Sequence, residues 1–177
     1  AAGWESVAVE ERGNPYISKA RAEMLRKALD AGADVIVFID YDVSWGPGDL
    51  LKLIETEGDL VAGLYPFKKD EEHYMGTLDC DPDGFPIVRA SDGALRGILA
   101  PAGFLKVTPA AIDRLMGSHP ELCFGPRYRP LVDLFNHGAH EGLWWGEDYA
   151  FCRRWRALGA DIWIVPDLDL THHAPGK

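Results

Sequence analysis

The chain has 177 residues, of which 47% are hydrophobic and 26% charged, as in one ordinary globular domain spanning residues 1–177. Its formal net charge of −10 argues against a nucleic-acid partner, because binding to a phosphate backbone needs clustered lysine and arginine. The three cysteines are odd in number and widely spaced, which argues against a disulfide framework and favours a reducing cytoplasm. No apolar run reaches the ~20 residues that cross a bilayer, so we expect no transmembrane segment.

Helical and extended patterns alternate along the chain. Apolar residues at helical spacing predict a helix that is capped by Ser18 and ends at Gly32, and the apolar run from Val35 to Ile39 predicts a strand buried on both faces. Further predicted elements are a helix ending at Gly58, a strand over residues 60–65, ordered chain over 98–107, a helix capped by Thr108 with Pro109 in its first turn, a helix over 147–158 and a strand over 161–165. This alternation is typical of an α/β fold.

Two segments lack a clear period. Residues 68–100 are rich in Asp and Gly, which predicts hairpins or a mobile loop rather than core. Residues 117–142 give no assignment. We therefore expect the sheet and its helices to come mainly from the other parts of the chain.

Asp40 and Asp42 follow directly after the apolar run. In an extended chain, residues i and i+2 point to the same face, so the two carboxylates are predicted to converge on one ligand. Ligands of open α/β sheets bind beyond the carboxyl ends of the strands, and a divalent cation relieves the repulsion between two neighbouring acids. The alternative is that both acids only solvate the strand end or cap the next helix.

Four motifs, in this order, resemble those of the metal-dependent glycosyltransferases of GT-A fold, especially a small bacterial and phage-type subgroup. They are FIDYDVSWGPGDLLKLIE, similar to the DxD segment, GLYPFKK, similar to the strand and lysine that follow it, GEDYAFCRRWRALG, similar to the acidic helix on the acceptor side, and DLDLTHH, similar to the C-terminal histidine element. The resemblance covers most of the chain. It implies a GT-A-like mixed sheet flanked by helices, and transfer of a sugar from a nucleotide-diphosphate donor to a saccharide or other hydroxyl acceptor.

The resemblance also implies a metal site for Mn²⁺ or Mg²⁺. Asp42 is expected to bind the ion, Asp40 to face the ribose or to reach the metal through water, and His172 to be the third protein contact, with His173 as the alternative. A bound cation stabilises the charge that develops on a diphosphate leaving group, and mixed oxygen and imidazole ligands suit Mn²⁺. Adjacent histidines near a C-terminus are also common as solvated surface residues.

Glu147 and Asp148 open the last predicted helix, where the helix dipole favours carboxylates whatever their function. In the functional interpretation, Asp148 accepts the proton of the acceptor hydroxyl, as the base of an inverting transferase, and Glu147 orients the acceptor. Trp144 and Trp145, just upstream, offer aromatic faces for a sugar ring, although tryptophans serve at least as often in core packing.

Arg21 stands where the family has an arginine near the nucleotide, although Ala22 replaces the usual asparagine beside it. Lys68 and Lys69 are placed to reach phosphate, while lysine pairs in loops are more often solvated surface. The resemblance begins after the first βα unit of the GT-A fold. We therefore expect either an N-terminally truncated domain without that unit or a replacement of it by the opening residues.

Two other function classes remain open. A nucleotidyltransferase of related fold would require a glycine-rich phosphate loop near the N-terminus, and none is visible. A non-catalytic nucleotide- or sugar-binding domain would use the same donor residues without chemistry. Binding and turnover assays with nucleotide sugars and Mn²⁺ separate these classes.

Overall fold

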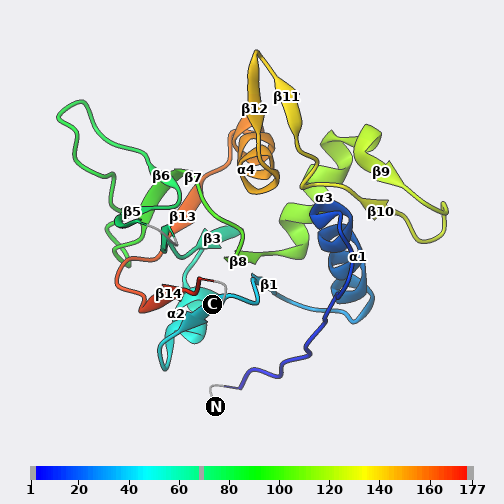
Figure 1. Cartoon of the computed structure of the whole chain (residues 1–177), viewed down its shortest axis with the longest axis horizontal. Coiled ribbons are helices and arrows are strands. Elements are labelled where there is room, and N and C mark those ends of the chain that lie inside the picture. Colours follow the sequence, from blue (N-terminus) through cyan, green and yellow to red (C-terminus); the bar gives the residue numbers. More distant parts are fainter. Residues whose placement is uncertain (1–2, 68–69, 175–177) are drawn as a thin grey trace.

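The computed structural model describes residues 3–67 and 70–174 and shows a mixed α/β fold built on one six-stranded sheet (Figure 1). In spatial order the strands are β1 (Ile36–Ile39), β8 (Phe104–Val107), β3 (Leu60–Ala62), β13 (Ile162–Ile164), β7 (Leu95–Leu99) and β6 (Thr77–Leu78). β3 and β13 run parallel, and each of the other neighbouring pairs is antiparallel. The sheet is therefore mixed, as predicted.

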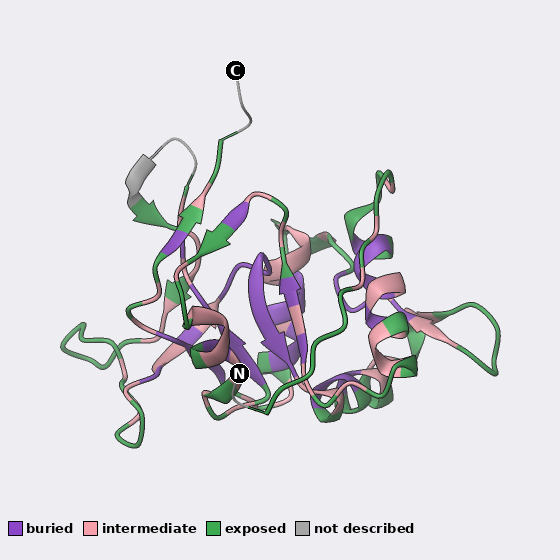
Figure 2. Ribbon diagram, turned by 90° about the horizontal axis from the view of Figure 1, so that it is seen from below, coloured by how far each residue is buried: buried purple, intermediate pink, exposed green. Residues whose placement is uncertain are grey.

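Helices cover both faces of this sheet. They are α1 (Ile17–Asp30), α2 (Asp49–Glu55), α3 (Pro109–Ser118) and α4 (Glu147–Ala157), with a 3-10 turn at Pro120–Leu122. The alternation of side chains along β3 shows the two faces, because Leu60 and Ala62 pack on one side and Val61 on the other. The strands at the centre are accordingly buried, as Figure 2 shows.

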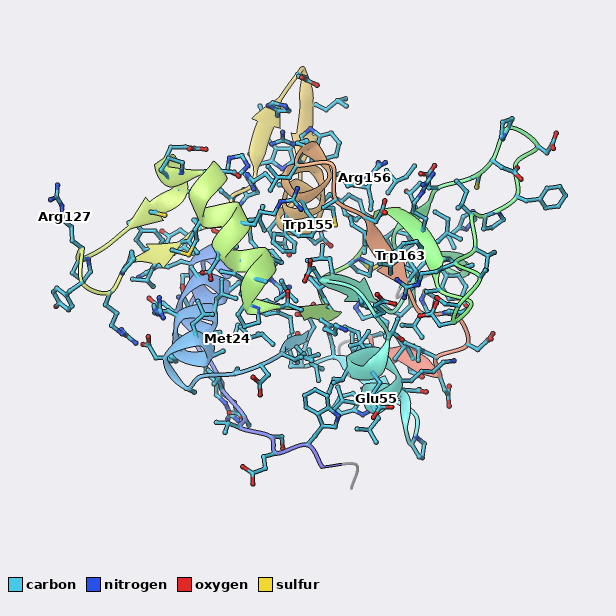
Figure 3. All side chains as sticks on the ribbon, turned by 180° about the vertical axis from the view of Figure 1, so that it is seen from behind. Met24, Glu55, Arg127, Trp155, Arg156 and Trp163 are labelled. Carbon is cyan, nitrogen blue, oxygen red and sulfur yellow. The ribbon has the colours of Figure 1, made fainter. Side chains whose placement is uncertain are left out.

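Two hydrophobic clusters hold these layers together. In the first, side chains of α1, α3 and α4 meet one face of the sheet. The labelled Trp155 of α4 is a fully buried member, and Met24 of α1 is partly buried against the cluster (Figure 3). In the second, Leu53 of α2 packs on the other face, with Trp163 at its border (Figure 3). Burial of a large apolar side chain contributes about 1.5–3 kcal/mol, so both clusters stabilise the packing of the helices on the sheet.

In the described part of the chain, four short antiparallel pairs lie outside the central sheet. They are β2 (Val43–Trp45) with β14 (Leu170–His172), β4 (Pro66–Phe67) with β5 (Asp70–Tyr74), β9 (Cys123–Phe124) with β10 (Leu131–Val132), and β11 (Gly138–His140) with β12 (Leu143–Trp145). The β2–β14 pair brings the C-terminal part of the chain beside the turn that follows β1. The β11–β12 hairpin projects beyond the start of α4 (Figure 1).

Most helix predictions are confirmed. α3 begins as expected, with the Thr108 hydroxyl accepting a hydrogen bond from the Ala111 N–H at 3.2 Å, and Gly32 ends the first helix region with a φ of 70°. The predicted cap at Ser18 is wrong, because α1 already begins at Ile17 and Ser18 is a buried helical residue.

Two strand predictions also need correction. β1 is an edge strand whose side chains alternate between buried and more exposed, so it is not buried on both faces. Within residues 70–100 the chain does form hairpin pairing, yet β7 lies inside the central sheet, where Gly97 packs against Ile162 and Ile164. The sequence did not predict β7, because Arg96 and Gly97 interrupt its apolar pattern and its burial depends on the neighbouring strand.

None of the helices in the part of the chain that the structure describes is long and apolar enough to span a bilayer.

Candidate functional site

The chain turns sharply after β1. The Asp40 N–H donates to the Gly103 carbonyl at 3.0 Å, and the Val43 N–H donates to the Asp40 carbonyl at 3.1 Å, which closes a turn over residues 40–43. The extended geometry predicted for Asp40 and Asp42 is therefore wrong. Because of this turn the two carboxylates diverge: Asp40 faces α1, and Asp42 faces β14.

Asp42 and His172 come together although they are far apart in the sequence. The β2–β14 ladder places His172 opposite Val43, and the His173 N–H donates to the Asp42 carbonyl at 2.7 Å. His172 Nε2 lies 3.8 Å from Asp42 Oδ1, and both side chains are largely buried, with 13% and 15% exposed. The predicted proximity of His172 and Asp42 is confirmed.

The hydrogen bonds of His172 suit a metal ligand. Its Nδ1 lies 3.2 Å from the Pro66 carbonyl oxygen. A carbonyl can only accept, so in the neutral ring Nδ1 carries the proton and the lone pair of Nε2 is on the side of Asp42. Metal-binding histidines generally donate their second ring N–H in this way. A carboxylate and an imidazole are both ligands of divalent cations, so Asp42 and His172 fit such an ion as two of its ligands.

Asp40 does not complete this pair. Within residues 3–67 and 70–174, no three or more His, Cys, Asp or Glu side chains are grouped so that they could hold a metal ion. The expected group of Asp40, Asp42 and His172 is thus not formed, because the turn directs Asp40 to Arg21 instead. His173, the alternative ligand, is exposed and its Nε2 lies 2.7 Å from the Ser44 hydroxyl oxygen.

Arg21 of α1 occupies the centre of the site. Its Nη2 lies 3.2 Å from Asp40 Oδ1 and 3.8 Å from Glu147 Oε1. Its guanidinium lies 5.5 Å from the ring centre of Phe38 and 5.1 Å from that of Phe135, within cation–π range. Only 4% of the side chain is exposed. The buried Arg21 guanidinium is therefore turned toward two partly exposed carboxylates.

Asp148 lies in the first turn of α4, next to Glu147. Burial raises the pKa of its carboxyl to about 6, and the negative charge of Glu147 adds to the effect. The Tyr149 N–H, which donates to Asp148 Oδ1 at 2.8 Å, and the nearby Arg21 partly oppose this rise. A carboxyl with this pKa changes charge near neutral pH, as a general base requires.

Tyr65 links the two halves of the site and was not predicted. Its ring packs edge-on against His172 with the ring centres 5.0 Å apart. Burial and then the charge of Asp40 raise the pKa of its hydroxyl above the ordinary value, and Asp148 contributes in the same direction. The Tyr65 side chain therefore extends from the Asp42–His172 pair to the Arg21 cluster, which we define as Arg21, Asp40, Glu147 and Asp148. The position of Tyr65 at the end of the strand expected over residues 60–65 was the signal available in the sequence.

Gly103 leaves the space in which these groups meet. A Cβ at this position would lie 2.2 Å from the Tyr65 hydroxyl oxygen and 2.8 Å from Asp40 Oδ2, so no side chain fits without displacing both. We expect Gly103→Ala to lower the free energy of unfolding by about 1–3 kcal/mol, the usual cost of overpacking. Urea denaturation would measure this change.

Gly117→Ala is the matched control for that substitution. Gly117 lies in α3, and a Cβ there would meet nothing within 4 Å. Alanine is a better helix former, so this variant is expected to be more stable by about 0.5–1 kcal/mol. Equal effects of the two substitutions would contradict a crowded site at Gly103.

The predicted acceptor tryptophans lie just before α4, on β12. Trp144 is 73% exposed, with its ring centre 6.0 Å from that of His137. Trp145 is half-buried, donates from Nε1 to the His140 carbonyl at 3.3 Å and lies beneath the Arg153 guanidinium. Trp144 therefore offers the open aromatic face of the two. Lys68, expected at the donor phosphates, and its neighbour Lys69 lie outside the described residues.

Comparisons with known proteins bear on the fold. No protein-family model and no curated protein matches the chain. Among solved structures, the crystal structure of A197 from STIV is similar, with a TM-score of 0.55 and 15% sequence identity over 92% of this chain and 70% of that chain. Likeness at this level of identity indicates a shared fold and carries no function.

Proposed function

We propose that the protein is a metal-dependent glycosyltransferase of GT-A-like fold that moves a sugar from a nucleotide-diphosphate donor to an acceptor hydroxyl with inversion. The observation that carries the proposal is the Asp42–His172 pair, with Nε2 and Oδ1 3.8 Å apart, joined through Tyr65 to a carboxyl whose pKa is about 6. A cation-binding pair and a general base are the two components that this chemistry requires.

Asp42 and His172 are the residues that would hold Mn²⁺ or Mg²⁺. When bound, the cation supplies Lewis-acid stabilisation of the negative charge on the diphosphate leaving group. The Pro66 carbonyl keeps the His172 ring in the tautomer that binds metal, because it accepts the proton of Nδ1.

Asp148 acts on the acceptor side. As the oxygen of the acceptor hydroxyl attacks the anomeric carbon, the bond from that carbon to the diphosphate breaks, and the hydroxyl proton passes to the Asp148 carboxylate. Glu147, held 3.8 Å from Arg21, accepts a hydrogen bond from the acceptor and orients it, and the exposed Trp144 ring provides a stacking face for a saccharide acceptor.

A screen of nucleotide sugars for Mn²⁺-dependent hydrolysis and binding tests this proposal. We expect at least one donor to be hydrolysed slowly with Mn²⁺ and not with excess EDTA. Release of pyrophosphate from a nucleoside triphosphate would instead support the nucleotidyltransferase of related fold. Binding of a nucleotide sugar without any turnover, even with a panel of acceptors, would support the non-catalytic binding domain.

A further inference from the structure

Three carboxyl groups lie near the single guanidinium of Arg21. Asp40 and Glu147 lie 3.2 and 3.8 Å from its Nη2, and they come from the turn after β1 and from the start of α4. Asp148 adds a third carboxyl; burial and the charge of Glu147 raise its pKa, and the charge of Arg21 opposes only part of that rise. The buried guanidinium of Arg21 is therefore the positive charge that faces all three carboxyl groups.

The remaining contacts of Arg21 do not explain its burial as simple packing. Nη1 has a long contact of 3.5 Å with the Ala102 carbonyl, and Nε has no hydrogen-bond partner among the described residues. A buried donor without a partner costs about 1–3 kcal/mol. Retention of an arginine at this cost is typical of a functional site rather than of a site optimised for stability.

We infer that Arg21 is a positioning residue, whose guanidinium holds Asp40 and Glu147 in place across the site without binding the donor. The effect of Arg21 on catalysis rests on the proposed function. The pairing of Arg21 with the two carboxylates is independent of that function. Without the guanidinium, Asp40, Glu147 and Asp148 would repel one another with no counter-ion between them. Glu147 would then lose the orientation on which the acceptor depends.

The pairing is tested by a double-mutant cycle in urea denaturation, using Arg21→Met, Glu147→Gln and both together. Because the two carboxylates are partly exposed, Arg21→Met should destabilise the protein and raise the equilibrium constant for unfolding by a factor of about 10–10² rather than more. In the Glu147→Gln background the same change should cost at least about threefold less. Equal costs in the two backgrounds would overturn the pairing, whatever the activity of the protein.

The positioning role is tested on the donor that the nucleotide-sugar screen identifies. Arg21→Met should lower kcat by about tenfold or more, while the affinity for UDP with Mn²⁺ stays within about threefold, and Arg21→Lys should recover part of kcat because it restores the charge. Lys19→Met is the control, since Lys19 lies on the same helix and forms an exposed pair with Glu23 at 3.5 Å.

The possible outcomes separate this inference from the proposed function. Parallel losses of UDP affinity and kcat in Arg21→Met would make Arg21 a donor contact and overturn the positioning role. If the unsubstituted protein turns over no donor at all, the proposed function fails. The double-mutant cycle of Arg21→Met and Glu147→Gln still tests whether Arg21 and Glu147 interact in that case.

Discussion

An Asp148→Asn variant is expected to transfer sugar about 10²–10⁴-fold more slowly than the unsubstituted protein, the usual contribution of a positioned general base. Donor affinity should barely change, because the base acts on the acceptor hydroxyl in the chemical step. The unsubstituted protein should gain activity as the pH rises through about 6, where its Asp148 carboxyl ionises. Initial rates at saturating donor, measured between pH 5 and pH 8, would show this ionisation and its absence in the variant.

The stability of the same variant separates a catalytic from a structural Asp148. Because the folded pKa is raised from 3.8 to about 6, the folded state binds the proton more tightly, so this contribution to stability is complete at low pH and is lost as the pH rises through about 6. At pH 8 the buried charge is therefore unfavourable. Asparagine should raise the free energy of unfolding there by on the order of 1–2 kcal/mol.

Asp113→Asn, on the exposed side of α3, is the control and should change neither turnover nor stability appreciably. A loss of stability at pH 8 together with the loss of turnover would make Asp148 part of the fold. Retention of the anomeric configuration in the product would end its assignment as the base of an inverting reaction.

The features that the sequence predicted correctly depend on local chemistry or on strong motifs. The Thr108–Pro109 start of α3 follows from capping, and the Glu147 start of α4 from acidic residues followed by helical spacing. The contact between His172 and Asp42 was predicted from the resemblance in motif order. It is made by pairing of β2 with β14, which no local pattern at either end specifies.

The errors came from geometry that depends on distant parts of the chain. Asp40 and Asp42 were expected on one face of the chain because the strand was assumed to continue through them. The chain instead turns at residues 40–43, and no glycine or proline in this stretch indicates a turn. Arg21 meets Glu147 only because α1 and α4 pack on the same face of the sheet. The crowding of Tyr65 against Gly103 likewise requires the pairing of β1, β3 and β8 to be known.

Asp42→Asn is expected to weaken Mn²⁺-dependent UDP binding by about 10²-fold or more. Mutation of a residue that only hydrogen-bonds to a metal ligand typically lowers metal affinity by about 10–100-fold, and loss of the ligand itself should cost more. Calorimetric titration with UDP, with and without Mn²⁺, would measure the loss, and in excess EDTA the variant and the unsubstituted protein should bind equally weakly.

Asp34→Asn is the matched control, because Asp34 is an exposed carboxylate just before the same strand, at its opposite end. Undiminished Mn²⁺-dependent affinity in Asp42→Asn would remove the metal from this pair. If His172→Ala shares the loss while His173→Ala does not, the ion lies between the turn after β1 and the end of β14, where the lone pair of His172 Nε2 is on the side of Asp42.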